Sequence, residues 1–161
     1  MLTIRRKNVP PQIFFDCVRP LQKWYWYLCR PYRPGAKTLI FHEGKVLLVR
    51  LGYSHKKWVF PGGGLKRGEQ PRDAAIREVK EETGIVLADV TYIGERFYTN
   101  QYKKVTQYYF TATTATSDIV IDGQEIIDAA WFPLNALPLE VSPRVVSEVA
   151  LYTEWKLTSQ V

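Results

Sequence analysis

The amino-acid sequence predicts a single folded domain of the α/β class in its α+β form, in which strands and helices occur in mixed order along the chain. Three observations lead to this expectation. β-rich runs outnumber helical runs along the chain. At 161 residues with 46% hydrophobic side chains, the chain is long enough for one domain with its own core. Its 24% charged and 14% aromatic residues fit a water-soluble protein, and no uninterrupted apolar run reaches the roughly 20 residues that a membrane-spanning helix needs.

The first expected element is a short helix over residues 20–30. Its apolar stripe occupies positions i, i+3, i+4 and i+7, filled by Leu21, Trp24, Tyr25 and Leu28. Prolines and a glycine in residues 31–35 then interrupt the helix. We therefore expect a basic, aromatic N-terminal extension over residues 1–35 and the folded domain over residues 36–161.

The domain is expected to open with a β-hairpin. The segment His42-Glu43-Gly44 separates two β-rich runs, residues 37–41 and 45–51, which is typical of a hairpin turn. A short strand over residues 58–60 then leads into Gly62, Gly63 and Gly64, whose backbone is free to take positive φ and to approach a metal or phosphates closely. Taken alone, such a glycine run is more often a plain turn.

The second half of the domain alternates helices and strands. Small and aliphatic residues give residues 71–83 the inner face of a helix, which Gly84 stops. An amphipathic helix is expected over residues 143–155. Further strands are expected over residues 86–96, 104–114 and 129–132.

The net charge of +6 is unevenly distributed. Residues 1–37 hold eight Lys or Arg and one acid, whereas residues 38–161 hold fourteen basic and fifteen acidic side chains. The surplus lies in the extension and favours an anionic surface or partner over substrate binding. For the extension we consider packing on its own domain, a homodimer with a second copy, or a peripheral membrane contact.

Cys17 and Cys29 lack metal or disulfide spacing and indicate a reducing compartment, the cytoplasm.

A spaced set of charged and glycine residues lies between positions 63 and 85. Its members are Gly63, Glu69, Arg77, Glu78, Glu81, Glu82, Gly84 and the aliphatic Ile85. The three glutamates after Arg77 lie at i, i+3 and i+4, so a helix places their carboxylates on one face. Taken alone, such an acidic run fits a solvated helix face. Crowded carboxylates favour a cation between them, and their hard oxygens suit Mg²⁺, with Mn²⁺ as a substitute.

The spacing G-x5-E-x7-R-E-U-x-E-E-x-G-U, where U is aliphatic, resembles the Nudix box at every defined position. The resemblance extends to residues 58–63 and 131–134, and it covers about residues 36–155. It implies a Nudix-type α-β-α sandwich around a mixed β-sheet. It also implies Mg²⁺-dependent hydrolysis of a phosphoanhydride bond in a nucleoside diphosphate linked to another moiety.

The resemblance also implies roles for individual residues. The metal would be held by Glu78, Glu81 and Glu82 together with a backbone carbonyl near Gly63. Arg77 would orient Glu69 or one of the catalytic carboxylates. The residues assigned to catalysis are Glu81, Glu82, Glu125 and Arg77.

A further acid before Trp131 would be an extra ligand or the base that deprotonates the attacking water. The candidates are Asp122, Glu125 and Asp128, of which we favour Glu125. Both histidines, His42 and His55, are interpreted as surface residues.

The substrate would be a nucleoside triphosphate, a nucleotide sugar or a dinucleotide polyphosphate, because selectivity depends on residues outside the box. Weak substrate-binding candidates are Glu69, Trp58 and Tyr102. Tyr102 lies seventeen residues beyond Ile85 and resembles a tyrosine of dinucleotide-polyphosphate hydrolases.

Two alternative functions are considered. One is an RNA 5′-end pyrophosphohydrolase whose basic extension follows the strand, although the sequence has no strong nucleic-acid signal. The other is a Nudix module that binds a nucleotide without cleaving it. Because no carboxylate of the box is lost, the enzyme is favoured over the binding module.

Overall fold

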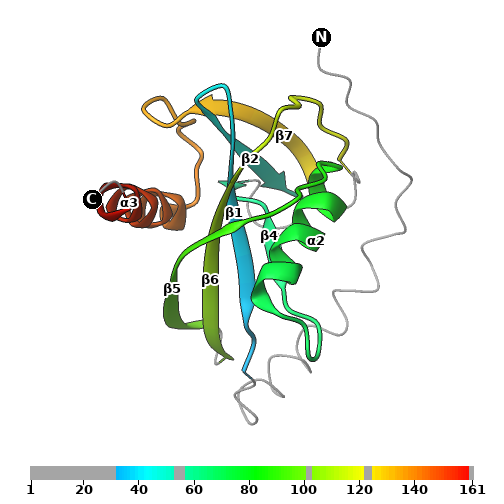
Figure 1. Cartoon of the computed structure of the whole chain (residues 1–161), viewed down its shortest axis with the longest axis vertical. Helices are drawn as coiled ribbons and strands as arrows, with labels where there is room; N and C mark the ends of the chain where they lie inside the picture. The colour runs from blue at the N-terminus through cyan, green and yellow to red at the C-terminus, as the bar shows by residue number, and fades with distance from the viewer. Residues whose placement is uncertain (1–31, 53–56, 101–102, 122–124, 160–161) are drawn as a thin grey trace.

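The structure is a computed structural model that describes residues 32–52, 57–100, 103–121 and 125–159. In this part of the chain a mixed β-sheet lies between helix α2, Pro71–Thr83, and helix α3, Pro143–Thr158 (Figure 1). The strands are β1 Gly35–His42, β2 Lys45–Leu51, β3 Trp58–Val59, β4 Gly62–Gly64, β5 Thr91–Asn100, β6 Lys103–Thr113 and β7 Ile126–Pro133. The expected α+β class and the sandwich of helices around a mixed sheet are confirmed.

The sheet is organised around β1, which has one parallel and two antiparallel neighbours. Along one edge β1 pairs in parallel with β6, which in turn pairs antiparallel with β5. Along its other edge β1 pairs antiparallel with two strands, each at a different part of its length. β4 pairs with residues 35–37 of β1, and β2 pairs with residues 41–42. β2 also carries β3 and β7, so the sheet divides at the middle of β1.

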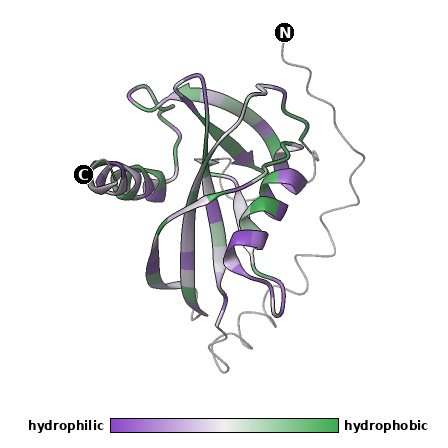
Figure 2. Ribbon diagram, viewed as in Figure 1, coloured by the Kyte–Doolittle hydropathy of each residue, from purple (hydrophilic) through white to green (hydrophobic). Residues whose placement is uncertain are grey.

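The two faces of the sheet bury separate hydrophobic cores because side chains alternate along each strand. Ala36 and Ile40 of β1 pack with α2, whereas Leu39 packs on the α3 side with Val145. β2 is hydrophobic along most of its length and buries residues on both faces (Figure 2). The sheet is therefore covered on both sides near β1 and β2.

Helix α2 has the bounds expected from the sequence. Pro71 is the first helical residue, where its missing N–H costs nothing. Gly84 takes the left-handed conformation at φ 72° and donates its N–H to the carbonyl of Lys80. A glycine adopts this conformation without the steric penalty of a side chain, which ends the helix after Thr83.

Two segments differ from the expected strands. Residues 62–64, which taken alone fit a plain turn, form β4 and pair with β1. Residues 86–90 were placed in a strand, but β5 begins only at Thr91. Their apolar side chains, such as Leu87 and Val90, fill the α2-side core from a loop. Burial alone produced the apolar pattern that we interpreted as a strand.

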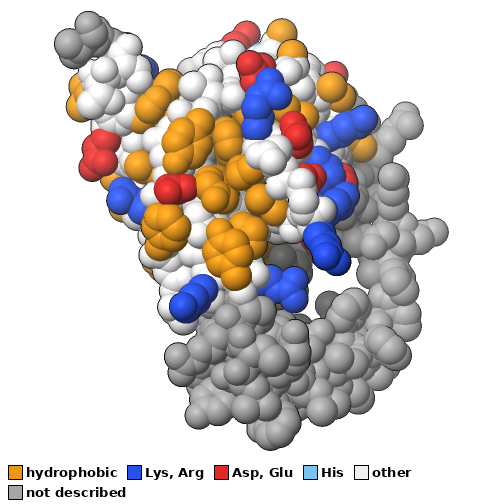
Figure 3. All heavy atoms as spheres, turned by 60° about the horizontal axis from the view of Figure 1, so that its bottom comes forward, with side chains coloured by type: hydrophobic (Ala, Val, Ile, Leu, Met, Phe, Trp, Pro, Cys, Tyr) orange, Lys and Arg blue, Asp and Glu red, His pale blue; other side chains and the backbone are white. Residues whose placement is uncertain are grey.

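One end of the molecule exposes apolar side chains (Figure 3). On β5, Tyr92 and Phe97 are exposed, and Tyr32 beside β6 is exposed as well. A recess of about 440 Å³ lies here and includes Phe97 and Lys104 in its lining. This face of the β5–β6 hairpin has no helix of the described chain over it.

Several expectations concern residues outside the described ranges. These include the helix over residues 20–30, and with it the homodimer and the membrane contact that we linked to the extension. They stay predictions, as do the domain boundary between residues 35 and 36 and the cytoplasmic location. Among the helices that the structure describes, none has the length and apolar character needed to cross a membrane.

Candidate active site

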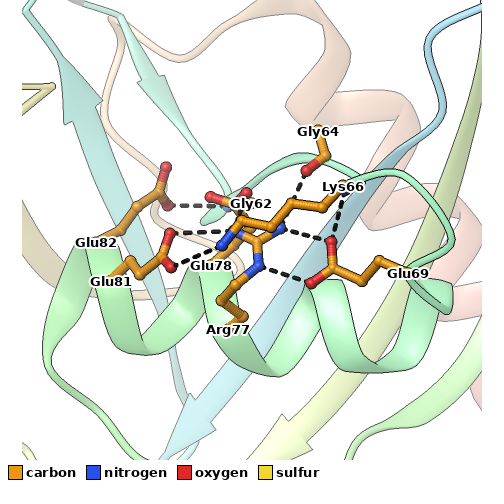
Figure 4. A network of polar contacts seen from close by, with 8 residues as sticks. All are labelled: Gly62, Gly64, Lys66, Glu69, Arg77, Glu78, Glu81 and Glu82. Atoms are coloured by element: carbon orange, nitrogen blue, oxygen red, sulfur yellow. Dashed lines mark hydrogen bonds and ion pairs between the residues drawn. The ribbon is translucent and has the colours of Figure 1, made fainter.

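The acidic residues of α2 point towards the glycine strand β4 (Figure 4). Glu78, Glu81 and Glu82 lie one turn apart on the same side of the helix, as their spacing predicts. β4 is held in place by its pairing with β1. The structure therefore brings the three glutamates and the glycine run together, although they are separated by the loop of residues 65–70.

The glycines of β4 allow a close approach that no other residue permits. A Cβ atom at Gly62 would lie 2.1 Å from the carbonyl oxygen of Ala36, and Gly62 has φ 143°. A Cβ atom at Gly63 would lie 2.6 Å from the carboxyl carbon of Glu78. The absence of side chains thus leaves room for the backbone of β1 and for the carboxylate of Glu78.

Glu82 has the most buried carboxyl group of the three and is 8% exposed. Its Oε2 accepts a hydrogen bond of 2.9 Å from the backbone N–H of Gly62. Burial raises the pKa of Glu82 from 4.5 to about 8, and the negative charges of Glu78 and Glu125 act in the same direction. The charged form of Glu82 is therefore poorly solvated at this position.

The charged form of Glu78 is also disfavoured by burial, although less than that of Glu82. Burial raises the pKa of Glu78 above its ordinary value, while a hydrogen bond of 2.7 Å from Arg77 opposes the shift. The charges of Glu81 and Glu125 raise it further. Four carboxylates consequently influence one another around the same position.

Arg77 connects this group to the loop that precedes α2. Its guanidinium donates two hydrogen bonds to Glu69, at 2.7 and 2.8 Å, in a bidentate arrangement. Its other bonds reach Glu78 at 2.7 Å, Glu81 at 3.0 Å and the carbonyl of Gly64 at 3.1 Å. Arg77 thus binds Glu69 and two of the expected metal ligands at once.

Glu69 is occupied by donors from the protein. Its Oε2 also accepts a hydrogen bond of 2.7 Å from the N–H of Lys66. The hydrogen bonds from Arg77 lower the pKa of Glu69 to about 2, and they raise the pKa of Arg77. Both oxygens of Glu69 therefore bind protein groups, which favours an orienting role over substrate binding.

The side chains of the three glutamates do not point towards one common position that could hold a metal ion. Within the described ranges, no group of three or more acidic, histidine or cysteine side chains is arranged to hold an ion. Glu78 and Glu81 turn towards Arg77, and Glu82 turns towards Gly62. The donors nevertheless fit a hard divalent cation, because Glu82 is buried, Glu78 is half-buried, and the negative charges of Glu78, Glu81 and Glu125 act against one another here.

Glu125 lies close enough to this group for its charge to act on both Glu78 and Glu82. It precedes β7, and its carbonyl accepts a hydrogen bond of 2.9 Å from the N–H of Gly52. The alternative Asp128 instead accepts a hydrogen bond of 3.0 Å from the N–H of Ala129. The structure therefore brings Glu125 towards the site, while Asp122 lies outside the described residues.

The other sequence candidates are placed elsewhere. Trp58 is buried in the α3-side core, where Phe132 packs edge-on and Arg50 lies over its ring. His42 contacts the carbonyl of Thr114, at 3.0 Å from its Nδ1. Tyr102 and His55 lie outside the described residues.

Lys37 of β1 also acts on this group of carboxylates, although no pattern in the sequence indicated it. Its positive charge acts on the carboxyl group of Glu82, and its Nζ lies 3.2 Å from Glu148 of α3. The contact depends on a strand and a helix that are 111 residues apart, so no local motif marks it.

Comparisons with known proteins identify the family of this chain. A family model described as NUDIX domain matches residues 31–151. An RNA pyrophosphohydrolase of Bartonella bacilliformis is 35% identical over 143 residues, covering 72% of this chain and 83% of the relative. A putative 8-oxo-dGTP diphosphatase of Bacillus subtilis is 30% identical over 112 residues, covering 70% of this chain and 74% of the relative.

Solved structures share the fold. A MutT protein from Methanosarcina mazei is 25% identical, with a TM-score of 0.65 over 82% of this chain and 98% of that chain. An Ap4A hydrolase from C. elegans has the same TM-score of 0.65 at 24% identity, over 78% of this chain and 98% of that chain. The arrangement of sheet and helices is therefore one that solved proteins also adopt.

Proposed function

The chain belongs to the Nudix hydrolase family, which hydrolyses pyrophosphate bonds in nucleotide-like substrates, and we propose that it does so with a magnesium ion held by Glu78, Glu81 and Glu82. Nudix hydrolases generally use divalent metals. The identity of the ion as Mg²⁺, with Mn²⁺ as a substitute, belongs to the proposal.

One observation carries the assignment of the ligands. Glu82 is almost fully buried, faces the negative charges of Glu78 and Glu125, and has a pKa raised to about 8. A buried carboxylate in that position is costly unless a cation compensates it. The backbone carbonyl of Gly63 completes the proposed ligand set. When bound, the ion would neutralise phosphate charge and polarise the phosphorus that water attacks.

The residues of the chain then divide the remaining tasks. Arg77 and Glu69 hold Glu78 and Glu81 in position through the hydrogen bonds already described. Glu125 accepts the proton of the attacking water. As the new P–O bond forms, the bridging P–O bond breaks, and the leaving phosphate keeps the electron pair. The products are two phosphate-bearing fragments of the substrate.

A screen that separates and quantifies the two phosphate-bearing products by ion-exchange chromatography tests the proposal. The substrates are nucleoside triphosphates, nucleotide sugars, dinucleotide polyphosphates and 5′-triphosphate RNA, each with Mg²⁺, with Mn²⁺ and with a chelator. We expect Glu81→Gln to lower turnover at least ~100-fold, the scale of a lost electrostatic contribution at such sites.

The matched control is Glu154→Gln, because Glu154 is an exposed glutamate on α3 and lies far along the chain from the box. It should retain the turnover of the unmodified protein. Undiminished turnover in Glu81→Gln would remove the role assigned to Glu81, and turnover in the presence of the chelator would remove the metal.

A second candidate is hydrolysis at the 5′ end of RNA. It is favoured by the relative from Bartonella bacilliformis, whose name is RNA pyrophosphohydrolase, and by the basic residues of 1–37. This candidate predicts turnover of 5′-triphosphate RNA that falls steeply between ~50 and ~200 mM salt, as phosphate contacts require. Equal turnover of RNA and free nucleoside triphosphates at both salt concentrations would argue against it.

A further inference from the structure

An ion pair is buried on the α3 side of the sheet, opposite the Nudix box. Glu148 of α3 is 2% exposed, and its Oε1 lies 3.2 Å from the Nζ of Lys37. The hydroxyl of Tyr109 donates to the same oxygen at 3.4 Å. The other oxygen, Oε2, is buried without a hydrogen-bond partner. A carboxylate buried in this way contributes little to the stability of the fold, because its contacts offset only part of the free energy of desolvation.

Lys37 lies at the point where the sheet divides. It pairs with Gly62 of β4, while β2 joins β1 only at Phe41. A Cβ atom at Gly62 would lie 2.7 Å from the Cα of Lys37, so the two backbones are in close contact. The N–H of Gly62 in turn binds Glu82. One residue therefore separates Lys37 from the buried carboxyl group of the site.

The charge of Lys37 reaches the site from this position. Lys37 pairs with Gly62, and the N–H of Gly62 binds Glu82, so the ammonium and that carboxyl group extend from neighbouring positions of β1 and β4. The side chain of Lys37 is 15% exposed, which leaves part of it accessible to a ligand. An ammonium has three N–H donors, of which Glu148 takes one.

We propose that Lys37 binds a phosphate oxygen of the substrate and that Glu148 is the positioning residue that holds the ammonium beside the divided sheet. The proposal rests on the proposed function, since it concerns the diphosphate that the site would bind. A lysine side chain is flexible, and it loses less freedom on binding when a fixed partner already orients it. The buried carboxylate supplies that fixed partner.

Binding of methylenediphosphonate in the presence of MgCl₂, measured by titration calorimetry, tests the contact without any turnover. This probe keeps the two phosphorus groups of a diphosphate but has a carbon bridge that water does not cleave. We expect Lys37→Met to weaken binding about tenfold, and Lys37→Arg to restore most of it, because a charge-assisted hydrogen bond is lost and then replaced.

The variant Glu148→Gln tests whether Glu148 positions the ammonium of Lys37 or only stabilises the fold. The amide has the shape of the carboxylate and still accepts from Tyr109, so we expect the unfolding temperature to stay close to that of the unmodified protein. Binding should weaken several-fold, because the ammonium is no longer held by a charge. The double variant Lys37→Met with Glu148→Gln should bind no more weakly than Lys37→Met alone, since Glu148 acts through Lys37.

The control is Asp89→Asn, which breaks an exposed ion pair with Arg72, 2.6 Å long. It should bind the probe like the unmodified protein. With the substrate found in the screen, Lys37→Met and Glu148→Gln should raise KM more than they lower kcat. A merely structural role would instead lower the unfolding temperature and leave KM unchanged.

Two results would overturn the inference: unchanged probe binding in Lys37→Met, or effects of Lys37→Met and Glu148→Gln that add in the double variant. Either result leaves the proposed function standing, provided that Glu81→Gln abolishes turnover. A protein that hydrolyses no substrate in the screen would instead remove the proposed function itself.

Discussion

The guanidinium of Arg77 donates to Glu69, Glu78 and Glu81 at the same time. These bonds fix the direction of two proposed metal ligands, and Glu69 fixes the direction of Arg77 in turn. Because arginine presents its donors in a planar fork, a lysine at this position would not reproduce the set. At the scale of single residues, the geometry of the site thus depends on a side chain that we assign no contact with substrate.

The pH dependence of Glu69→Gln tests the link between Glu69 and Arg77. Hydrogen bonds from Arg77 lower the pKa of Glu69 from 4.5 to about 2. A carboxyl group whose pKa is lowered on folding stabilises the protein above its unfolded pKa, and this contribution is lost as the pH falls through the folded value. We expect Glu69→Gln to be less stable by about 1–2 kcal/mol at pH 7, with the difference shrinking below pH ~4.5.

Urea unfolding at a series of pH values measures this difference. Glu154→Gln provides the control, since it removes the charge of an exposed glutamate and should show no such trend. A stability difference between Glu69→Gln and the unmodified protein that persists unchanged down to pH ~2 would contradict the assigned charge interaction.

Among the secondary-structure elements, α2 and β4 show what the sequence does and does not predict. Pro71 and Gly84 mark the ends of α2 through their own backbone preferences, so local sequence predicts its bounds. β4 consists of glycines, which disfavour strands, and it forms because β1 offers an unpaired edge there. The shared face of the three glutamates was likewise predictable from their spacing on one helix. The ion pair of Lys37 and Glu148 was not predictable, because it joins residues 111 positions apart that only the tertiary structure brings together.

Gly63→Ala tests whether β4 is shaped to receive the carboxylate of Glu78. The added Cβ would lie 2.6 Å from that group, so the side chain of Glu78 must move. Because the displaced atoms are the far end of a flexible side chain, we expect little loss of stability, and we expect Mg²⁺ affinity and kcat/KM to fall at least ~10-fold. Gly64→Ala is the matched control, because the nearest atom to its Cβ, the carbonyl oxygen of Pro34, lies 4.0 Å away.

Titration with Mg²⁺ followed by initial rates distinguishes the two alanine variants. If Gly63→Ala and Gly64→Ala retain the same Mg²⁺ affinity, β4 does not determine the position of Glu78, and the close approach has no functional meaning.

On the scale of the whole molecule, the site lies where both faces of the sheet contribute. On one face, α2 supplies the carboxylates. On the other face, α3 supplies Glu148, which accepts a hydrogen bond from Lys37. The divided edge of β1 connects the two faces at Gly62. Because the repelling carboxylates are held in place by the folded chain, a cation that binds them also stabilises the fold as a whole.

Metal binding should therefore raise the unfolding temperature of the protein, and a variant that lacks one ligand should lose that effect. At a Mg²⁺ concentration of ~100 times Kd, binding to the folded state alone adds about 2.7 kcal/mol of stability. We expect Glu82→Gln to lose most of this gain. Without metal, the same variant should be at least as stable as the unmodified protein, because a neutral amide replaces a buried carboxyl group beside the charges of Glu78 and Glu125. Thermal unfolding with Mg²⁺ and with a chelator measures both effects, and Glu154→Gln should respond to Mg²⁺ like the unmodified protein. An equal gain from Mg²⁺ in Glu82→Gln would place the ion elsewhere.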